Sequence, residues 1–118
     1  MSQRPSELRV SKDRRTLTLG HESGDAGTIS AELLRVESPS AEVQGHGAGQ
    51  KTLVAGKRNV AIQSIETVGN YAVRIGFDDG HSTGIYTWPY LAKLAAEGPA
   101  MLDAYEHALT QAGQSRDA

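Results

Sequence analysis

The strongest constraint on the fold of this chain is a stretch of alternating residues between positions 71 and 78. One face of an extended strand here carries four apolar side chains: Tyr71, Val73, Ile75 and Phe77. The dipeptide Gly69-Asn70 precedes them and favours a tight turn, because glycine accepts positive φ. We therefore predict a hairpin of strands 60–68 and 71–78, with the Tyr71 to Phe77 face toward the core.

Further strands flank this hairpin. The phase of strand 60–68 changes near Gln63-Ser64, which predicts a bulge there. The turn Asp79-Gly80 leads into a third strand over 81–86. Near the start of the chain, residues 8–10 and 16–19 read as a second hairpin, and Thr28-Ile29 as a short extended piece.

Helices are expected before and after the central strands in the sequence. Ser30 is a suitable N-cap for a helix over 31–36, and Thr87 for a helix that ends at Gly98. Pro99 then opens a second helix that ends near Gly113, and residues 114–118 are expected to fray. The predicted class is α+β: a small, mainly antiparallel β-sheet with helices packed against it and a C-terminal helix. The expected organisation is a tail over 1–6, one domain over 7–97, and the C-terminal helix with its tail over 98–118.

Charge and hydropathy narrow the range of partners. The net charge of −2 lacks the basic excess of a nucleic-acid-binding surface, so nucleic acid is not expected as a partner. The sequence has no apolar run of about 20 residues, so membrane insertion is not expected either. The polar start of the chain has no signal-peptide core, and we expect a cytoplasmic protein. The absence of cysteine excludes disulfides and thiolate chemistry.

The segment 38–59 has no periodicity and is rich in glycine, which predicts a flexible loop. Its glycines at 45, 47 and 49 suggest a phosphate loop, but the required pattern is absent. Lys51 stands where that motif needs its first glycine, and Gly56-Lys57 is followed by Arg58 instead of Ser or Thr. A phosphate-binding role is therefore rejected.

Among the four histidines, His81 is the candidate for chemistry. His21 and His46 fall in predicted loops, and His107 falls on the polar face of a helix. His81 follows the Asp79-Gly80 turn, which would fix its position. If Asp78 is its cross-strand neighbour, the carboxylate would orient the imidazole for acid/base or metal chemistry. A structural role for a histidine beside a turn is the favoured alternative.

Tyr86, Trp88 and Tyr90 form an aromatic cluster where the last strand meets the helix. They allow two interpretations. They can stack on a ligand or partner, or they can close the core with their polar atoms at its edge, and we favour the core.

Two strings in this region carry a family resemblance: VGNYAV over 68–73 and FDDGHSTGIYTW over 77–88. They resemble the gamma-butyrobetaine hydroxylase-like N-terminal domain family, also called DUF971, over roughly residues 5–97. Members stand alone in bacteria or are fused to carnitine-pathway dioxygenases and to ATPases of iron–sulfur cluster assembly. Because the dioxygenase catalytic residues lie in a separate domain, the resemblance implies a chain without that activity.

The resemblance also implies a zinc site, made in the family by a Cys-Pro-Cys-x-x-Cys segment and the histidine of the DGH turn. Ser38, Ser40 and Val43 occupy the cysteine positions here, and His81 occupies the histidine position. Neutral hydroxyls are poor zinc ligands and valine is none, so the family zinc site is not expected. A substitute site would use His81, His46 and either Glu42 or Asp79. No cofactor is expected, with zinc and iron left open.

The sequence thus predicts a non-catalytic binding or accessory module that lacks the family zinc. Its expected partner is another protein. The resemblance implies iron–sulfur or oxygenase metabolism as the context. The candidate functional surface consists of five residues: His81, Asp78, Asp79, Trp88 and Tyr86. The alternatives are a metal-binding or acid/base enzyme site around His81, and a homo-oligomer formed through Leu102, Tyr105 and Leu109 of the C-terminal helix.

Overall fold

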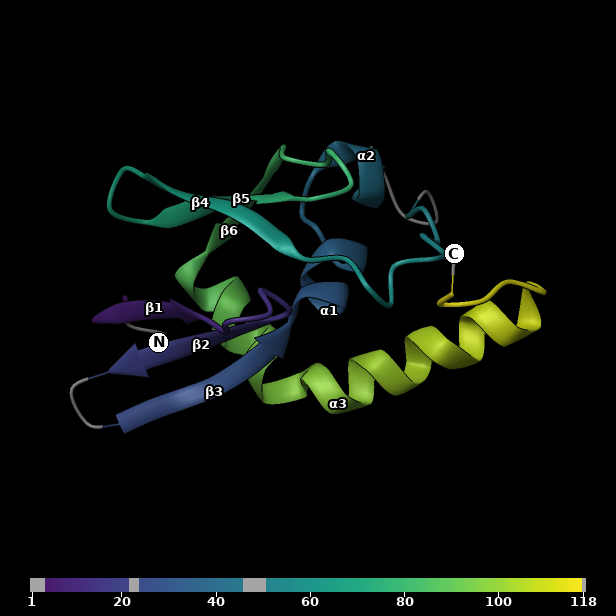
Figure 1. Ribbon diagram of the computed structural model, residues 1–118, viewed down its shortest axis with the longest axis horizontal. Coiled ribbons are helices and arrows are strands. Elements are labelled where there is room, and N and C mark those ends of the chain that lie inside the picture. The colour runs from purple at the N-terminus through teal and green to yellow at the C-terminus, as the bar shows by residue number, and fades with distance from the viewer. Residues whose placement is uncertain (1–3, 22–23, 46–50, 118) are drawn as a thin grey trace.

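The computed structural model describes residues 4–21, 24–45 and 51–117 and has two antiparallel sheets of three strands each. The first sheet, in the order β1-β2-β3, consists of β1 (Glu7–Val10), β2 (Thr16–His21) and β3 (Gly24–Ser30). The second, in the order β4-β5-β6, consists of β4 (Ile62–Val68), β5 (Ala72–Phe77) and β6 (Gly84–Thr87). The predicted α+β class is confirmed, with the strands divided between two sheets (Figure 1).

The part of the chain that the structure describes also contains three helices: α1 (Ala31–Val36), α2 (Ala41–Gln44) and α3 (Trp88–Gln111). The two predicted N-caps are confirmed, because Ser30 Oγ accepts from Leu33 N–H at 3.1 Å and Thr87 Oγ1 accepts from Tyr90 N–H at 3.3 Å. Helix α2 lies inside the segment predicted as loop 38–59. A single turn is too short to show a helical period.

Helix α3 runs through Gly98 and Pro99, where the sequence suggested a break between two helices. Gly98 is buried, and a Cβ atom there would lie 3.3 Å from the side chain of Leu33. The glycine therefore permits close packing of α3 on α1 and does not end the helix. Pro99 withholds one hydrogen bond from the carbonyl of Ala95, and this local loss is outweighed by the contacts of α3 with α1, β3 and β6.

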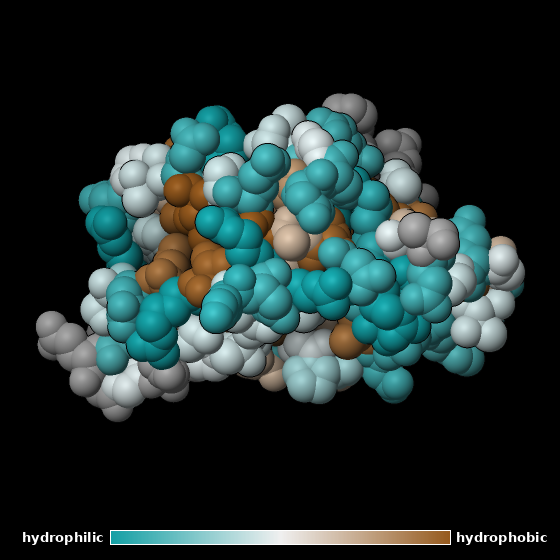
Figure 2. All heavy atoms as spheres, viewed as in Figure 1, coloured by the Kyte–Doolittle hydropathy of each residue, from teal (hydrophilic) through white to brown (hydrophobic). Residues whose placement is uncertain are grey.

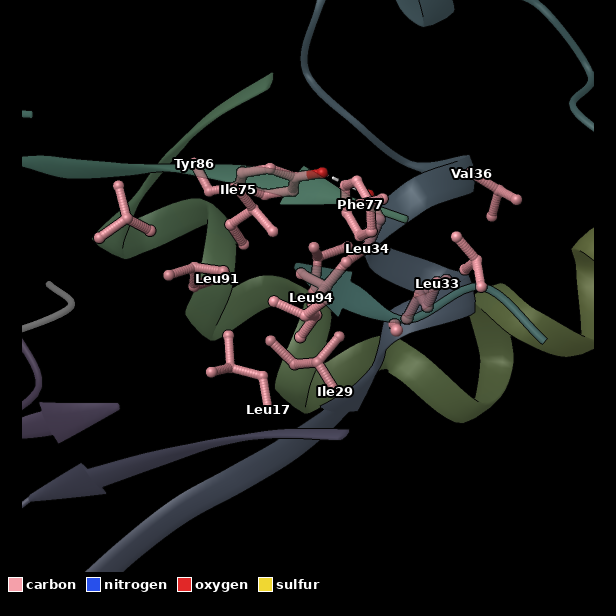
Figure 3. Packing of buried hydrophobic residues seen from close by; sticks show 14 of the residues in the cluster. Leu17, Ile29, Leu33, Leu34, Val36, Ile75, Phe77, Tyr86, Leu91 and Leu94 are labelled. Atoms are coloured by element: carbon pink, nitrogen blue, oxygen red, sulfur yellow. Dashed lines mark hydrogen bonds between the residues drawn. The ribbon is translucent and has the colours of Figure 1, made fainter. Parts of the chain in front are cut away.

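The core lies between the two sheets, where α1 and the first half of α3 pack together (Figure 3). Leu17 and Ile29 come from the first sheet, and Ile75 and Phe77 from the second; all four are at most 2% exposed. Figure 2 shows that hydrophobic atoms also reach the surface between the sheets on the face in view. Burial of this apolar area is what holds the two sheets together.

The predicted core face of β5 is confirmed except at its first residue. Val73, Ile75 and Phe77 are buried, but Tyr71 is 54% exposed. The connection is one residue longer than predicted, since Val68 pairs with Ala72 and leaves Tyr71 in the turn. The predicted bulge is confirmed, because the register of β4 shifts between Ile62 and Ser64.

Among the other strands, β6, β2 and β3 differ most from their predicted limits. β6 begins at Gly84, because residues 78–83 form the connection from β5. β2 continues through His21, and β3 is a full strand of seven residues instead of a short piece. Glycines at 20, 24 and 27 interrupt the apolar alternation of β2 and β3, so this pattern does not predict the β2–β3 hairpin.

The segment after α3 is bound to the rest of the fold, contrary to the predicted fraying of residues 114–117. The carbonyls of Ser115 and Arg116 accept from Gly56 N–H and Arg58 N–H, both at 2.9 Å. Arg116 also forms an ion pair with Glu32 of α1 at 2.6 Å. Within the described residues, no helix has the length and apolar character needed to cross a membrane.

Candidate functional site

The side chain of His81 lies in a buried polar cluster with two serines. Its Nε2 atom is 2.9 Å from Ser38 Oγ and 3.3 Å from Ser40 Oγ, and the two hydroxyls are 3.2 Å apart. Ser38 is 0% exposed, Ser40 7% and His81 8%. Ser38, Ser40 and His81, which the family resemblance places at metal-ligand positions, are therefore in mutual contact.

The β5–β6 connection and the α1–α2 connection hold this cluster from opposite sides. The backbone N–H of His81 donates to Asp79 Oδ1 at 3.0 Å, and its carbonyl accepts from Phe77 N–H at 2.8 Å. Ser38 and Ser40 follow α1, and Ser40 is the N-cap residue of α2. The cluster thus fastens the start of α2 to the second sheet.

Glu42 of α2 lies on the other side of the imidazole. Its Oε2 atom is 3.3 Å from His81 Nδ1, and its Oε1 accepts from Thr83 Oγ1–H at 2.9 Å. A neutral imidazole with its proton on Nδ1 directs it at the carboxylate and leaves Nε2 to accept from one of the two serine hydroxyls. Ser38, His81 and Glu42 are connected in the order of a nucleophile, a base and an acid that orients the base.

Burial, followed by the positive charge of Arg35, lowers the pKa of His81, although Glu42 and Asp79 act in the opposite direction. The imidazole is therefore neutral near pH 7. Burial alone would raise the pKa of Asp79. Hydrogen bonds from Lys57, the His81 backbone and Arg35 outweigh it and hold that pKa at about 2.

Asp78 does not orient the imidazole, contrary to the sequence prediction. Its carboxylate accepts from Ala61 N–H at 3.0 Å and so closes the end of the β4–β5 pair. Asp79 is the acid that contacts the His81 backbone, and it also binds Arg35 at 2.8 Å and Lys57 at 2.7 Å. The sequence analysis missed both cations, since they lie far from Asp79 in the chain.

The donor set of the cluster does not fit a zinc ion. Two neutral hydroxyls and one imidazole already satisfy one another, and Val43, at the remaining position, is 2% exposed and offers only methyl groups. The Asp79 carboxylate already forms ion pairs with Arg35 and Lys57. His46 lies outside the described residues. Over 4–21, 24–45 and 51–117, no group of three or more His, Asp or Glu side chains is placed to hold a metal.

Tyr86 and Trp88 of the aromatic cluster belong to the core, whereas Tyr90 is half-buried. Tyr86 is 0% exposed and donates its hydroxyl to the carbonyl of Leu34, as Figure 3 shows. Trp88 is 8% exposed and donates from Nε1 to the Asn70 carbonyl at 2.8 Å. Tyr90 donates to the carbonyl of Glu37. Each polar atom thus has a partner at the edge of the core.

The two other histidines that the structure describes lie apart from the His81 cluster. His21 ends β2, and His107 is exposed on α3, where it contacts Gln111 at 3.1 Å. Of the side chains proposed for a homo-oligomer, Tyr105 is 6% and Leu109 2% exposed, because both pack inside the chain. A dimer through those two residues would have to open the core first.

A groove of about 680 Å³ lies between α1 and α3, and it was not predicted from the sequence. One wall is the end of α1 with residues 51–54, and the other is α3. Its lining is mostly apolar and includes Leu53, Val54, Met101 and Tyr105. No sequence pattern indicates this groove, because residues 51–54 show no hydrophobic periodicity and are far from α3 in the sequence.

Comparison with known proteins identifies the family. The model for "Gamma-butyrobetaine hydroxylase-like, N-terminal" matches residues 8–92. Two proteins with NMR solution structures are similar over nearly the whole chain. One is 43% identical with a TM-score of 0.84, covering 99% of this chain and 92% of that one. The other is 45% identical with a TM-score of 0.78, covering 94% and 83%.

A crystal structure from Acidithiobacillus ferrooxidans, of a DUF971-family protein of unknown function, is 36% identical. Its TM-score is 0.60, and the match covers 77% of this chain and 91% of that one. No curated protein matches. The family match spans most of the chain and contains the Ser38–Ser40–His81 cluster. The chain therefore belongs to the gamma-butyrobetaine hydroxylase-like N-terminal domain family, also called DUF971.

Proposed function

We propose that this chain is a non-catalytic accessory module that binds another protein. The observation that carries the proposal is the closed state of the His81 cluster. Ser38 has no exposed surface, and a Cβ atom added to Gly84 would lie 2.4 Å from its Oγ. A substrate has no approach to the hydroxyl, so the polar groups most suited to chemistry serve to hold α2.

The groove between residues 51–54 and α3 supports the binding part of the proposal. It combines an apolar lining with an exposed large side chain, Leu53, which is 36% exposed. Apolar surface that stays open in a small domain is typical of a binding site. The fusions that the family resemblance implies favour a partner in iron–sulfur or oxygenase metabolism.

Site-specific photo-crosslinking tests this proposal in the cells that produce the protein. A benzoylphenylalanine replaces Leu53 in the groove or, as a matched control, Tyr71, the other exposed large hydrophobic residue, which lies in the β4–β5 turn. We expect a discrete protein adduct from position 53 and none from position 71. Equal labelling at both positions, or no adduct at position 53, would overturn the proposal.

The Ser38–His81–Glu42 connection favours a second candidate, a hydrolase in which Ser38 is the nucleophile. This function requires α2 to move away and expose the hydroxyl. A fluorophosphonate probe distinguishes the two candidates, because it labels activated serines covalently. Labelling that Ser38→Ala removes would establish the hydrolase, whereas equal background in both proteins supports the binding module.

A further inference from the structure

The groove also limits the kind of partner that it fits. We propose that it binds an acidic amphipathic helix of another protein, an inference that rests on the proposed binding role. Figure 1 places the segment around residues 51–58 across from the C-terminal half of α3. Three properties of this groove carry the inference: fixed walls, short side chains on the α3 wall, and an excess of positive charge.

The walls are fixed by two tyrosine hydroxyls. Tyr105 donates to the carbonyl of Val54, and Tyr90 donates to the carbonyl of Glu37, so α3 is bonded to both parts of the opposite wall. Burial raises the pKa of each tyrosine to about 12, and the hydroxyls stay protonated donors at neutral pH. Because these hydrogen bonds fix the positions of the two walls, the groove needs little rearrangement to bind a partner.

The α3 wall has the length and the side chains to bind a helix. Its lining residues extend from Tyr90 to Ala108, about 27 Å at about 1.5 Å per residue. Ala104 and Ala108 are one turn apart, and their short side chains let a second helix approach closely. Met101 adapts its shape to different apolar side chains, and Leu53 faces α3 from the other wall.

The charged residues of the lining favour an acidic partner. They are Glu37, Lys51 and Lys93. Lys51 is bound to Glu37 at 2.6 Å, so its charge is matched within the chain. Lys93 is exposed and has no ion pair with any residue that the structure describes. A carboxylate on the partner would complement it.

Titration of the ¹⁵N-labelled full chain with two synthetic helices tests the inference. Both peptides have about 15 residues and the same leucine stripe at helical spacing. One has glutamates beside the stripe, and the other has lysines at the same positions. Two variants complete the design: Ala104→Arg fills the groove, and Ala96→Arg places the same side chain on the exposed surface of α3 outside it.

We expect the glutamate peptide to shift the amide signals of residues 51–54 and 101–108, and to bind about threefold or more tightly than the lysine peptide. Ala104→Arg should weaken binding at least about tenfold, Ala96→Arg should not, and Lys93→Glu should reverse the charge preference. Equal binding of both peptides, or shifts outside the groove, would overturn the inference. A parallel titration with the fatty acid dodecanoate tests for a lipid ligand, and shifts of the groove signals with dodecanoate but with neither peptide would also overturn the inference. So would the same shifts on raising the protein concentration without peptide, because they would indicate self-association.

The two proposals fail in different ways. A crosslink at position 53 without selective binding of the glutamate peptide would leave the binding module standing and remove the acidic helix as its partner. Absence of the crosslink, together with absence of peptide binding, would remove both.

Discussion

Glu32 in α1 and Arg116 after α3 are 84 positions apart and form a two-point ion pair. Nε of Arg116 is 2.7 Å from one carboxylate oxygen of Glu32, and Nη2 is 2.6 Å from the other. The Glu32 side chain is 5% exposed and that of Arg116 is 19% exposed. A carboxylate this deeply buried needs its partner, because a buried charge without one is strongly destabilising.

Arg116→Met should lower the free energy of unfolding by about 2–3 kcal/mol, since it leaves Glu32 buried without a counter-charge. Urea denaturation measures the change. Arg58→Met is the matched control, because the Arg58–Asp117 pair is exposed and should cost less than about 1 kcal/mol. Equal losses in the two variants would contradict a special role for the buried pair.

Gly84→Ala should destabilise the protein by about 1–3 kcal/mol, the usual cost of overpacking. The added Cβ would lie 2.4 Å from Ser38 Oγ and 3.1 Å from Tyr86. Adding Ser38→Ala removes that oxygen and should restore part of the loss, so the double mutant will be more stable than the sum of the single changes predicts. Thermal unfolding of all four proteins measures this coupling, and strict additivity would argue against the contact.

Acid pH should destabilise the fold through His81. Its pKa in the fold lies below the ordinary value of 6.5, so the fold favours the neutral imidazole. This contribution is complete above pH 6.5 and is lost as the pH falls through the folded-state pKa. Urea midpoints at about pH 7.5 and pH 5 should therefore differ more for the wild type than for His81→Gln.

Asp79 does not interfere with this comparison. Its pKa falls from 3.8 to about 2 on folding, so its contribution is lost only as the pH drops from 3.8 toward 2. A wild-type midpoint that changes no more than that of His81→Gln over the tested range would show that His81 does not titrate as inferred.

Pro99→Ala should stabilise the protein by about 1–3 kcal/mol, because alanine supplies the missing N–H to the Ala95 carbonyl and favours the helix. Ala100→Pro, one position later on the exposed side of α3, should instead destabilise it by about 3 kcal/mol. Circular dichroism during thermal unfolding measures both. A loss of stability in Pro99→Ala would mean that α3 depends on the geometry imposed by the proline.

Tag-free protein should contain far less than one equivalent of zinc or iron by elemental analysis. The hydroxyls of Ser38 and Ser40 and the methyl groups of Val43 replace thiolates, and neither group binds these metals well. Stoichiometric metal that disappears in His81→Ala would contradict this prediction. It would reinstate a metal site built from nitrogen and oxygen ligands.

The sequence predicted the local elements well where period and capping agree. Val73, Ile75 and Phe77 alternate strictly, and Ser30 and Thr87 precede apolar helical residues, so these elements appear as expected. It failed at Gly98-Pro99, because local propensity cannot register that Gly98 lies against Leu33. Tertiary packing decided the continuity of α3.

The candidate site was predicted in part. His81 was predicted from its turn, and Ser38 and Ser40 from the family resemblance. The prediction that Asp78 holds His81 in place was wrong, because Asp79 binds the His81 backbone and Glu42 faces its imidazole. Groups brought together from distant segments leave no pattern of spacing. The groove is such a case, since Leu53 and Met101 are distant in the sequence and line the same groove only in the folded chain.

The Glu32–Arg116 pair also has a consequence for the order of events during synthesis. Helix α1 leaves the ribosome 84 residues before Arg116, an interval of roughly 4–17 s at about 5–20 residues per second. Until Arg116 is made, Glu32 packed in the core would be a buried carboxylate without this counter-charge, which disfavours the native position of α1. The native packing of α1 therefore becomes more favourable once the segment after α3 has been made.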